Sequence, residues 1–99
     1  MRLTPEQIEA IRSGAAQVAG AAARVWLFGS RVRDDERGGD VDLLPEVDEP
    51  VAEPAQLAAR LAARVSRAMH GRKVDVLVQA PNLMRLPIHA IAHEEGIRL

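Results

Sequence analysis

Apolar residues along the chain form short runs that alternate with amphipathic segments. Thr4, Pro5 and Gln7 are residues that favour the start of a helix, and apolar residues then recur at helical spacing, which predicts a helix over 5–22. The next apolar run, 25–28, is short and is stopped by glycine. It predicts a strand that is buried on both faces.

Later segments continue this alternation of strands and helices. The predicted elements are a short helix over 31–36, a strand over 41–47, a helix over 54–70, a strand over 73–79, a helix within 81–95 that Pro87 kinks or delays, and an edge strand at 97–99. Pro45 indicates that its strand is an exposed edge or ends irregularly, because proline has no N–H for the ladder. The pattern predicts an α/β (α+β) fold with a small mixed β-sheet and helices packed against it.

Composition narrows the class of protein. The 99 residues fit a single domain, 1–99, and 13 basic against 14 acidic residues leave a formal charge of -1. No global positive field attracts nucleic acid or a membrane, so we expect neither as a direct partner. The chain has no cysteine and no apolar run of the length that a membrane span needs, which is typical of a soluble cytoplasmic protein.

A Gly-Ser corner follows the first predicted strand. When a strand turns at once into a helix, backbone N–H groups point outward at the positive end of the helix dipole and can bind phosphate. Gly29 lets a ligand approach the backbone closely, and Ser30 can donate its hydroxyl. Ordinary strand-to-helix turns have the same pattern, so phosphate binding needs support from other residues.

Three aspartates on the two following strands give this support. Asp40 and Asp42 are two residues apart on one strand, so their side chains point to the same face, where they suit Mg²⁺ or Mn²⁺. The alternative is a solvated strand face. Asp75 interrupts an apolar strand in which an unpaired carboxylate would be costly to bury. It completes a metal cluster if the two strands are neighbours, or it pairs with an arginine such as Arg72.

The segments "GSRVR", "GDVDLL" and "KVDVLV" together resemble a minimal nucleotidyltransferase (MNT) domain of the DNA polymerase β-like nucleotidyltransferase superfamily. The resemblance covers essentially the whole chain and implies the nucleotidyltransferase fold. It also implies transfer of a nucleoside monophosphate from an NTP to a hydroxyl. By resemblance, Gly29 and Ser30 bind the triphosphate, while Asp40, Asp42 and Asp75 are catalytic residues that bind the metals.

The family resemblance also suggests a biological role. Such proteins commonly form toxin–antitoxin modules with a HEPN-domain RNase, which the MNT protein neutralises by adenylylating a tyrosine with ATP. We therefore expect a hetero-oligomer with a HEPN-domain toxin. The alternatives are a protein that neutralises its partner by binding alone, and a small-molecule nucleotidyltransferase completed by dimerisation. The small size of the chain favours a macromolecular acceptor over a small one.

For several further residues, the sequence leaves more than one role open. Arg31 and Arg33 match the family pattern and are candidates for nucleotide binding or partner contact, or they are solvated surface charges. His89 and His93 are four residues apart on a predicted helix, but no third metal ligand is evident beside them. Gly39 precedes the first aspartate where many relatives have serine, a departure that removes no ligand.

Overall fold

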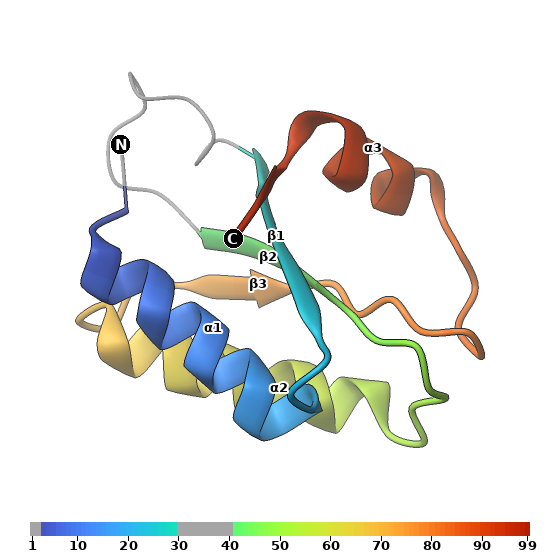
Figure 1. Ribbon diagram of the computed structural model, residues 1–99, viewed down its shortest axis with the longest axis horizontal. Helices are drawn as coiled ribbons and strands as arrows, with labels where there is room; N and C mark the ends of the chain where they lie inside the picture. Colours follow the sequence, from blue (N-terminus) through green and yellow to red (C-terminus); the bar gives the residue numbers. More distant parts are fainter. Residues whose placement is uncertain (1–2, 30–40) are drawn as a thin grey trace.

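The protein is a four-stranded sheet between helices, seen in a computed structural model that describes residues 3–29 and 41–99. Two helices, α1 and α2, lie side by side on one face, and α3 lies on the other (Figure 1). The elements are α1 (Pro5–Ala19), β1 (Arg24–Phe28), β2 (Val41–Glu46), α2 (Pro54–Ala68), β3 (Val74–Val76), α3 (Pro87–Glu95) and β4 (Ile97–Arg98). None of the helices in the described ranges has the length and apolar character of a bilayer span.

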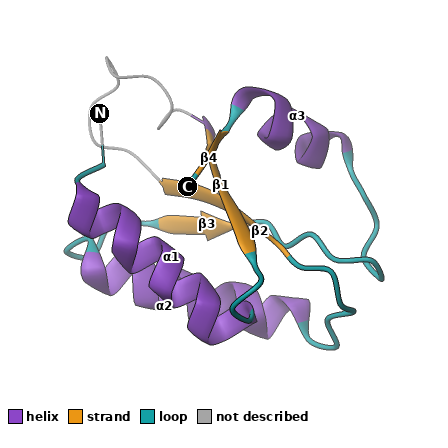
Figure 2. Ribbon diagram, viewed as in Figure 1, coloured by secondary structure: helices purple, strands orange, loops and turns teal. Residues whose placement is uncertain are grey.

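The sheet is mixed, as predicted. Its strand order is β3-β2-β1-β4, with β1 antiparallel to both β2 and β4, and β2 parallel to β3. A parallel pair needs a crossover connection, which α2 provides between β2 and β3 (Figure 2). The predicted strand at the C-terminal end is β4, at one edge of this α+β arrangement.

The main core lies between the sheet and the helix pair α1–α2. Its members are Ile11, Ala15, Val25, Leu27, Val41, Leu43, Leu61, Val65, Met69 and Val74. Full burial of each large aliphatic side chain contributes roughly 1.5–3 kcal/mol. The prediction that β1 is buried on both faces was wrong: only alternate residues are fully buried, and Trp26 and Phe28 on the other face remain partly exposed.

The helix starts follow the local sequence more closely than the helix ends. Thr4 and Gln7 form the expected capping box at the start of α1, and α3 begins at Pro87. The first helix ends at Ala19, three residues earlier than predicted, because Gly20 adopts φ 109°, outside the helical region. The predicted helix over 31–36 lies outside the described residues.

Of the two alternatives for Pro45, an exposed edge or an irregular end of its strand, the exposed edge is wrong. It lies in β2, which has a neighbour on each side, and its side chain is fully buried. Its carbonyl accepts the N–H of Gln79 at 3.0 Å, but its nitrogen has no proton to donate to the same neighbour. The regular β2–β3 ladder accordingly stops at Val76 and resumes only as an isolated bridge at Gln79, which shortens the strand predicted over 73–79.

Candidate functional site

Three of the predicted site residues meet at one end of the sheet. Gly29 directly follows β1, whose last residue, Phe28, pairs with Asp42 of β2. Asp42 is in turn the register partner of Asp75 in the parallel pair β2–β3. Neighbouring strands are about 4.8 Å apart, and paired residues project to the same face. The two carboxylates therefore stand side by side, with Gly29 on the other flank of Asp42.

Glycine is required at position 29 for two reasons. The residue has φ +76°, a conformation that other residues adopt only with strain. A Cβ at this position would also collide with the carboxylate of Asp42. The backbone after β1 therefore lies directly against this carboxylate, with no side chain between them. The contact places the Asp42 carboxylate directly beside the corner where phosphate binding is predicted. Ser30 itself lies outside the described residues.

The exposure of Asp75 differs from the prediction. Asp42 is half-buried, whereas Asp75 is exposed, because β3 is the edge strand of the sheet. The inference that Asp75 interrupts a buried strand was therefore wrong, although its strand does lie beside β2. An exposed Asp75 carries little desolvation cost and can be reached from solvent.

The donor set fits a hard divalent cation. Carboxylate oxygens from adjacent strands are ligands that Mg²⁺ and Mn²⁺ prefer, and two like charges so close favour a cation between them. Within residues 3–29 and 41–99, no group of three metal-ligating side chains occurs. The third predicted ligand, Asp40, and the predicted nucleotide-binding residues Arg31 and Arg33 lie outside those ranges.

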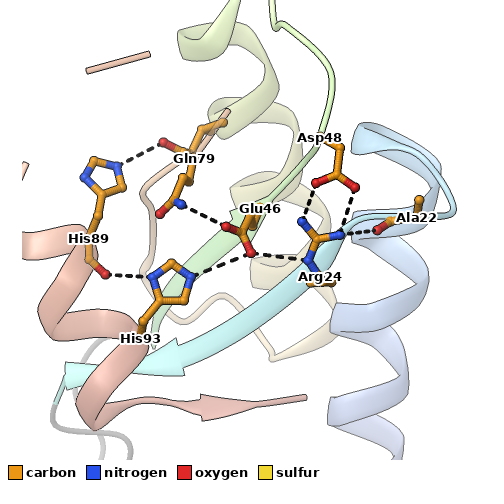
Figure 3. A network of polar contacts seen from close by, with 8 residues as sticks. Ala22, Arg24, Glu46, Asp48, Gln79, His89 and His93 are labelled. Carbon is orange, nitrogen blue, oxygen red and sulfur yellow. Dashed lines mark hydrogen bonds and ion pairs between the residues drawn. The ribbon is translucent and has the colours of Figure 1, made fainter. Parts of the chain in front are cut away.

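A network of polar side chains on the same face of the sheet was not predicted (Figure 3). Arg24 donates to Glu46 at 3.2 Å and to Asp48 at 2.8 Å, and Gln79 donates to the other oxygen of Glu46 at 2.8 Å. The hydrogen bond from Arg24, together with its charge, holds the pKa of Asp48 below its usual value. The hydrogen bonds to Asp48 and then to Glu46 raise the pKa of Arg24.

The two histidines of α3 are parts of this packing. His89 is buried, its Nδ1 accepts the N–H of Leu86 at 3.0 Å, and its Nε2 lies 3.2 Å from the carbonyl oxygen of Val78. Since Nδ1 is an acceptor, the ring proton is on Nε2 and is donated to Val78. Both nitrogens of His89 are therefore engaged within the protein, which leaves neither for a metal.

His93 joins α3 to the sheet. Its Nδ1 lies 3.0 Å from the carbonyl oxygen of His89, and its Nε2 lies 3.7 Å from Oε1 of Glu46. Its ring meets Trp26 edge-on, with ring centroids 4.4 Å apart. The spacing of the two histidines is visible in the sequence, but the partners from β1 and β2 are too distant along the chain for any local pattern to identify.

Comparison with known proteins identifies the family but not the acceptor. No curated protein matches the chain. The family model described as "Nucleotidyltransferase domain" matches residues 8–98, which is nearly the whole chain and includes every predicted site residue. The part of the chain that the structure describes folds as three helices on a four-stranded mixed sheet, which is consistent with that family. This chain therefore belongs to the nucleotidyltransferase domain family, whose members transfer nucleotidyl groups.

Proposed function

We propose that this protein transfers AMP from ATP to a hydroxyl group of a partner protein and thereby acts as an antitoxin. The expected acceptor is a tyrosine of a HEPN-type RNase. The observation that carries the transferase part is the alignment of Asp42 with Asp75 beside Gly29, within a chain that matches the nucleotidyltransferase family. The choice of a HEPN-type partner is based on the resemblance to MNT domains. Exposed apolar side chains on the surface support a protein as the acceptor.

The reaction is a displacement at the α-phosphorus of ATP. The acceptor oxygen forms a bond to this phosphorus, the bond to the oxygen that bridges to the β-phosphate breaks, and pyrophosphate leaves with the electron pair. Gly29 and Ser30 hold the triphosphate, and Asp40, Asp42 and Asp75 hold the divalent metal. When bound, the metal supplies positive charge that stabilises the attacking and leaving oxygens. Asp75, which is exposed, accepts the hydroxyl proton directly or through water.

Exposed apolar side chains support a macromolecular acceptor. The large apolar residues exposed in the described part of the chain all lie on α3 or next to it: Met84, Leu86, Ile88, Ile91 and Ile97. Because His93 of α3 packs on Trp26, this helix covers the sheet face that also carries Asp42. Exposed large apolar side chains grouped around one element are typical of a protein interaction site. A protein bound there would lie on the same face as the carboxylates.

Mass spectrometry of co-expressed proteins tests the proposal. The chain is produced with a HEPN-domain protein in the presence of Mg²⁺, and we expect the partner mass to increase by whole AMP units. The Asp40→Ala/Asp42→Ala variant should leave the partner unmodified. If that variant still binds and silences an unmodified partner, neutralisation occurs by binding alone and the transferase role in this module is wrong.

A further inference from the structure

One side of α2 carries a concentrated positive charge. Residues 54–68, which form α2, contain three basic residues and no acidic residue, although the whole chain has a formal charge of -1. Arg60, Arg64 and Arg67 follow one another at i, i+4 and i+7, so they form one stripe along the helix. All three are exposed. We call these three residues the arginine stripe.

The arginine stripe borders a groove between α1 and α2. The groove has a volume of about 430 Å³, and it is lined on the α1 side by Ala10, Ser13, Gly14 and Gln17 and on the α2 side by Arg64, Arg67 and Ala68. Its small side chains leave room for a group from outside. The guanidinium of Arg64 donates a hydrogen bond to the side chain of Gln17, which holds Arg64 over the groove.

Few local negative charges offset the stripe. Arg60 and Arg67 make no ion pair or hydrogen bond with the described residues, and the contact of Arg64 is with a neutral amide. Three guanidinium groups within one turn or two of a helix repel one another mildly, and a carboxylate between them removes that repulsion. The chemistry of the stripe therefore favours a partner that presents several anionic groups at similar spacing.

We propose that the arginine stripe and the adjoining α1–α2 groove bind an acidic segment of a partner protein. Charge complementarity favours an anionic occupant. A protein segment fits better than nucleic acid for two reasons. The chain as a whole is slightly acidic, whereas nucleic-acid-binding proteins are commonly basic. Its two aromatic residues, Trp26 and Phe28, lie on the opposite face of the sheet, so they are unable to stack on bases at the stripe. The proposal is independent of the transferase chemistry, since Asp42 and Asp75 also lie on that opposite face.

The test uses a labelled alanine-based helical peptide with glutamates at i, i+4 and i+7, and the same peptide with glutamines as control. Fluorescence anisotropy should show binding of the glutamate peptide alone, and binding should weaken as NaCl rises from about 50 to 300 mM. In ¹⁵N NMR spectra, the amides of Gly14 and Gln17 and the Nε–H groups of the stripe should shift more than those elsewhere.

Charge-matched variants decide where the peptide binds. Arg60→Gln/Arg64→Gln/Arg67→Gln should weaken binding about tenfold, as expected for three exposed charge pairs. Arg12→Gln/Arg85→Gln/Arg98→Gln, which removes the same charge from exposed arginines elsewhere, should change it less than about twofold. Circular dichroism checks that both variants fold. An equal loss of peptide affinity in both variants overturns the proposal. Tighter binding of single-stranded RNA than of the glutamate peptide also overturns it, as does self-association of the protein that requires the stripe.

Discussion

Asp42 and Asp75 are register partners on parallel neighbouring strands, so their carboxylates project from the same face of the sheet. The two negative charges repel one another, and a divalent cation bound between them would remove this repulsion. Substitution of either residue should therefore weaken metal binding more than it changes the free energy of unfolding. Like charges on neighbouring strands cost roughly 0.2–1 kcal/mol.

The first prediction concerns Asp42→Asn. Transfer activity should fall by at least about a hundredfold, because a metal ligand is lost and with it several kcal/mol of charge stabilisation in the transition state. The free energy of unfolding, measured in urea, should stay the same or rise by up to about 1 kcal/mol. Glu49→Gln removes an exposed carboxylate away from the site and should keep full activity. Retained transfer in Asp42→Asn would place the catalytic centre elsewhere.

Binding of nucleotide and metal should stabilise the protein. At a concentration of Mg²⁺ and ATP about 100 times the dissociation constant, mass action adds about 2.7 kcal/mol to the free energy of unfolding. Differential scanning fluorimetry should show a higher melting temperature for the native chain and no shift for Asp42→Asn. If the melting temperature of the native chain does not change at saturating Mg²⁺ and ATP, the protein does not bind nucleotide and metal at the candidate site.

Substitution of Gly29 should reduce transfer activity in addition to the loss of stability that comes from backbone strain. Gly29→Ala forces a Cβ into the space of the Asp42 carboxylate and also strains a residue with φ +76°. Gly71→Ala is the matched control, because Gly71 has φ +83° and open space around it. Each variant should lose about 1–2 kcal/mol of stability from the backbone. Only Gly29→Ala should also lose transfer activity, and equal activity in both would contradict a role of this close approach.

The order of helices and strands could be predicted from local patterns, whereas the pairing of strands could not. The capping residues at Thr4 and the late start at Pro87 depend only on adjacent residues, and both predictions were confirmed. The alternative that Pro45 lies at an exposed edge and the expected burial of Asp75 were both wrong, because they depend on which strand lies in the centre of the sheet and which at its edge. No local pattern carries that information.

For the candidate site too, local patterns identified some residues, whereas contacts between distant segments could not be predicted. The spacing of "GS", "DVD" and "KVDV" identified residues that the sheet brings together at Gly29, Asp42 and Asp75. The network around Glu46 was missed because its members come from β1, β2, α3 and the segment after β3, and each polar residue alone is typical of a surface. Their roles depend on long-range packing.

His89 should contribute strongly to stability. His89→Ala would leave the N–H of Leu86 and the carbonyl of Val78 without their partner and open a cavity under α3. The expected loss is about 2–4 kcal/mol in urea unfolding. His70→Ala, at an exposed position after α2, should change stability by less than about 0.5 kcal/mol. Binding of Zn²⁺ or Ni²⁺ by the native chain that is lost in His89→Ala would contradict a purely structural role.

The ion pair between Arg24 and Asp48 should make the free energy of unfolding depend on pH in the acidic range. Because Arg24 lowers the pKa of Asp48, the pair stabilises the fold above the unfolded pKa of about 3.9, and this contribution is lost as the pH falls through the lower folded value. The effect is small, since the Asp48 side chain is 73% exposed. Asp48→Asn should be slightly less stable than the native chain in urea at pH 7, and the two should converge below about pH 4. Glu49→Gln should show no such convergence, and a constant difference between Asp48→Asn and the native chain at every pH would rule out the ion pair as its cause.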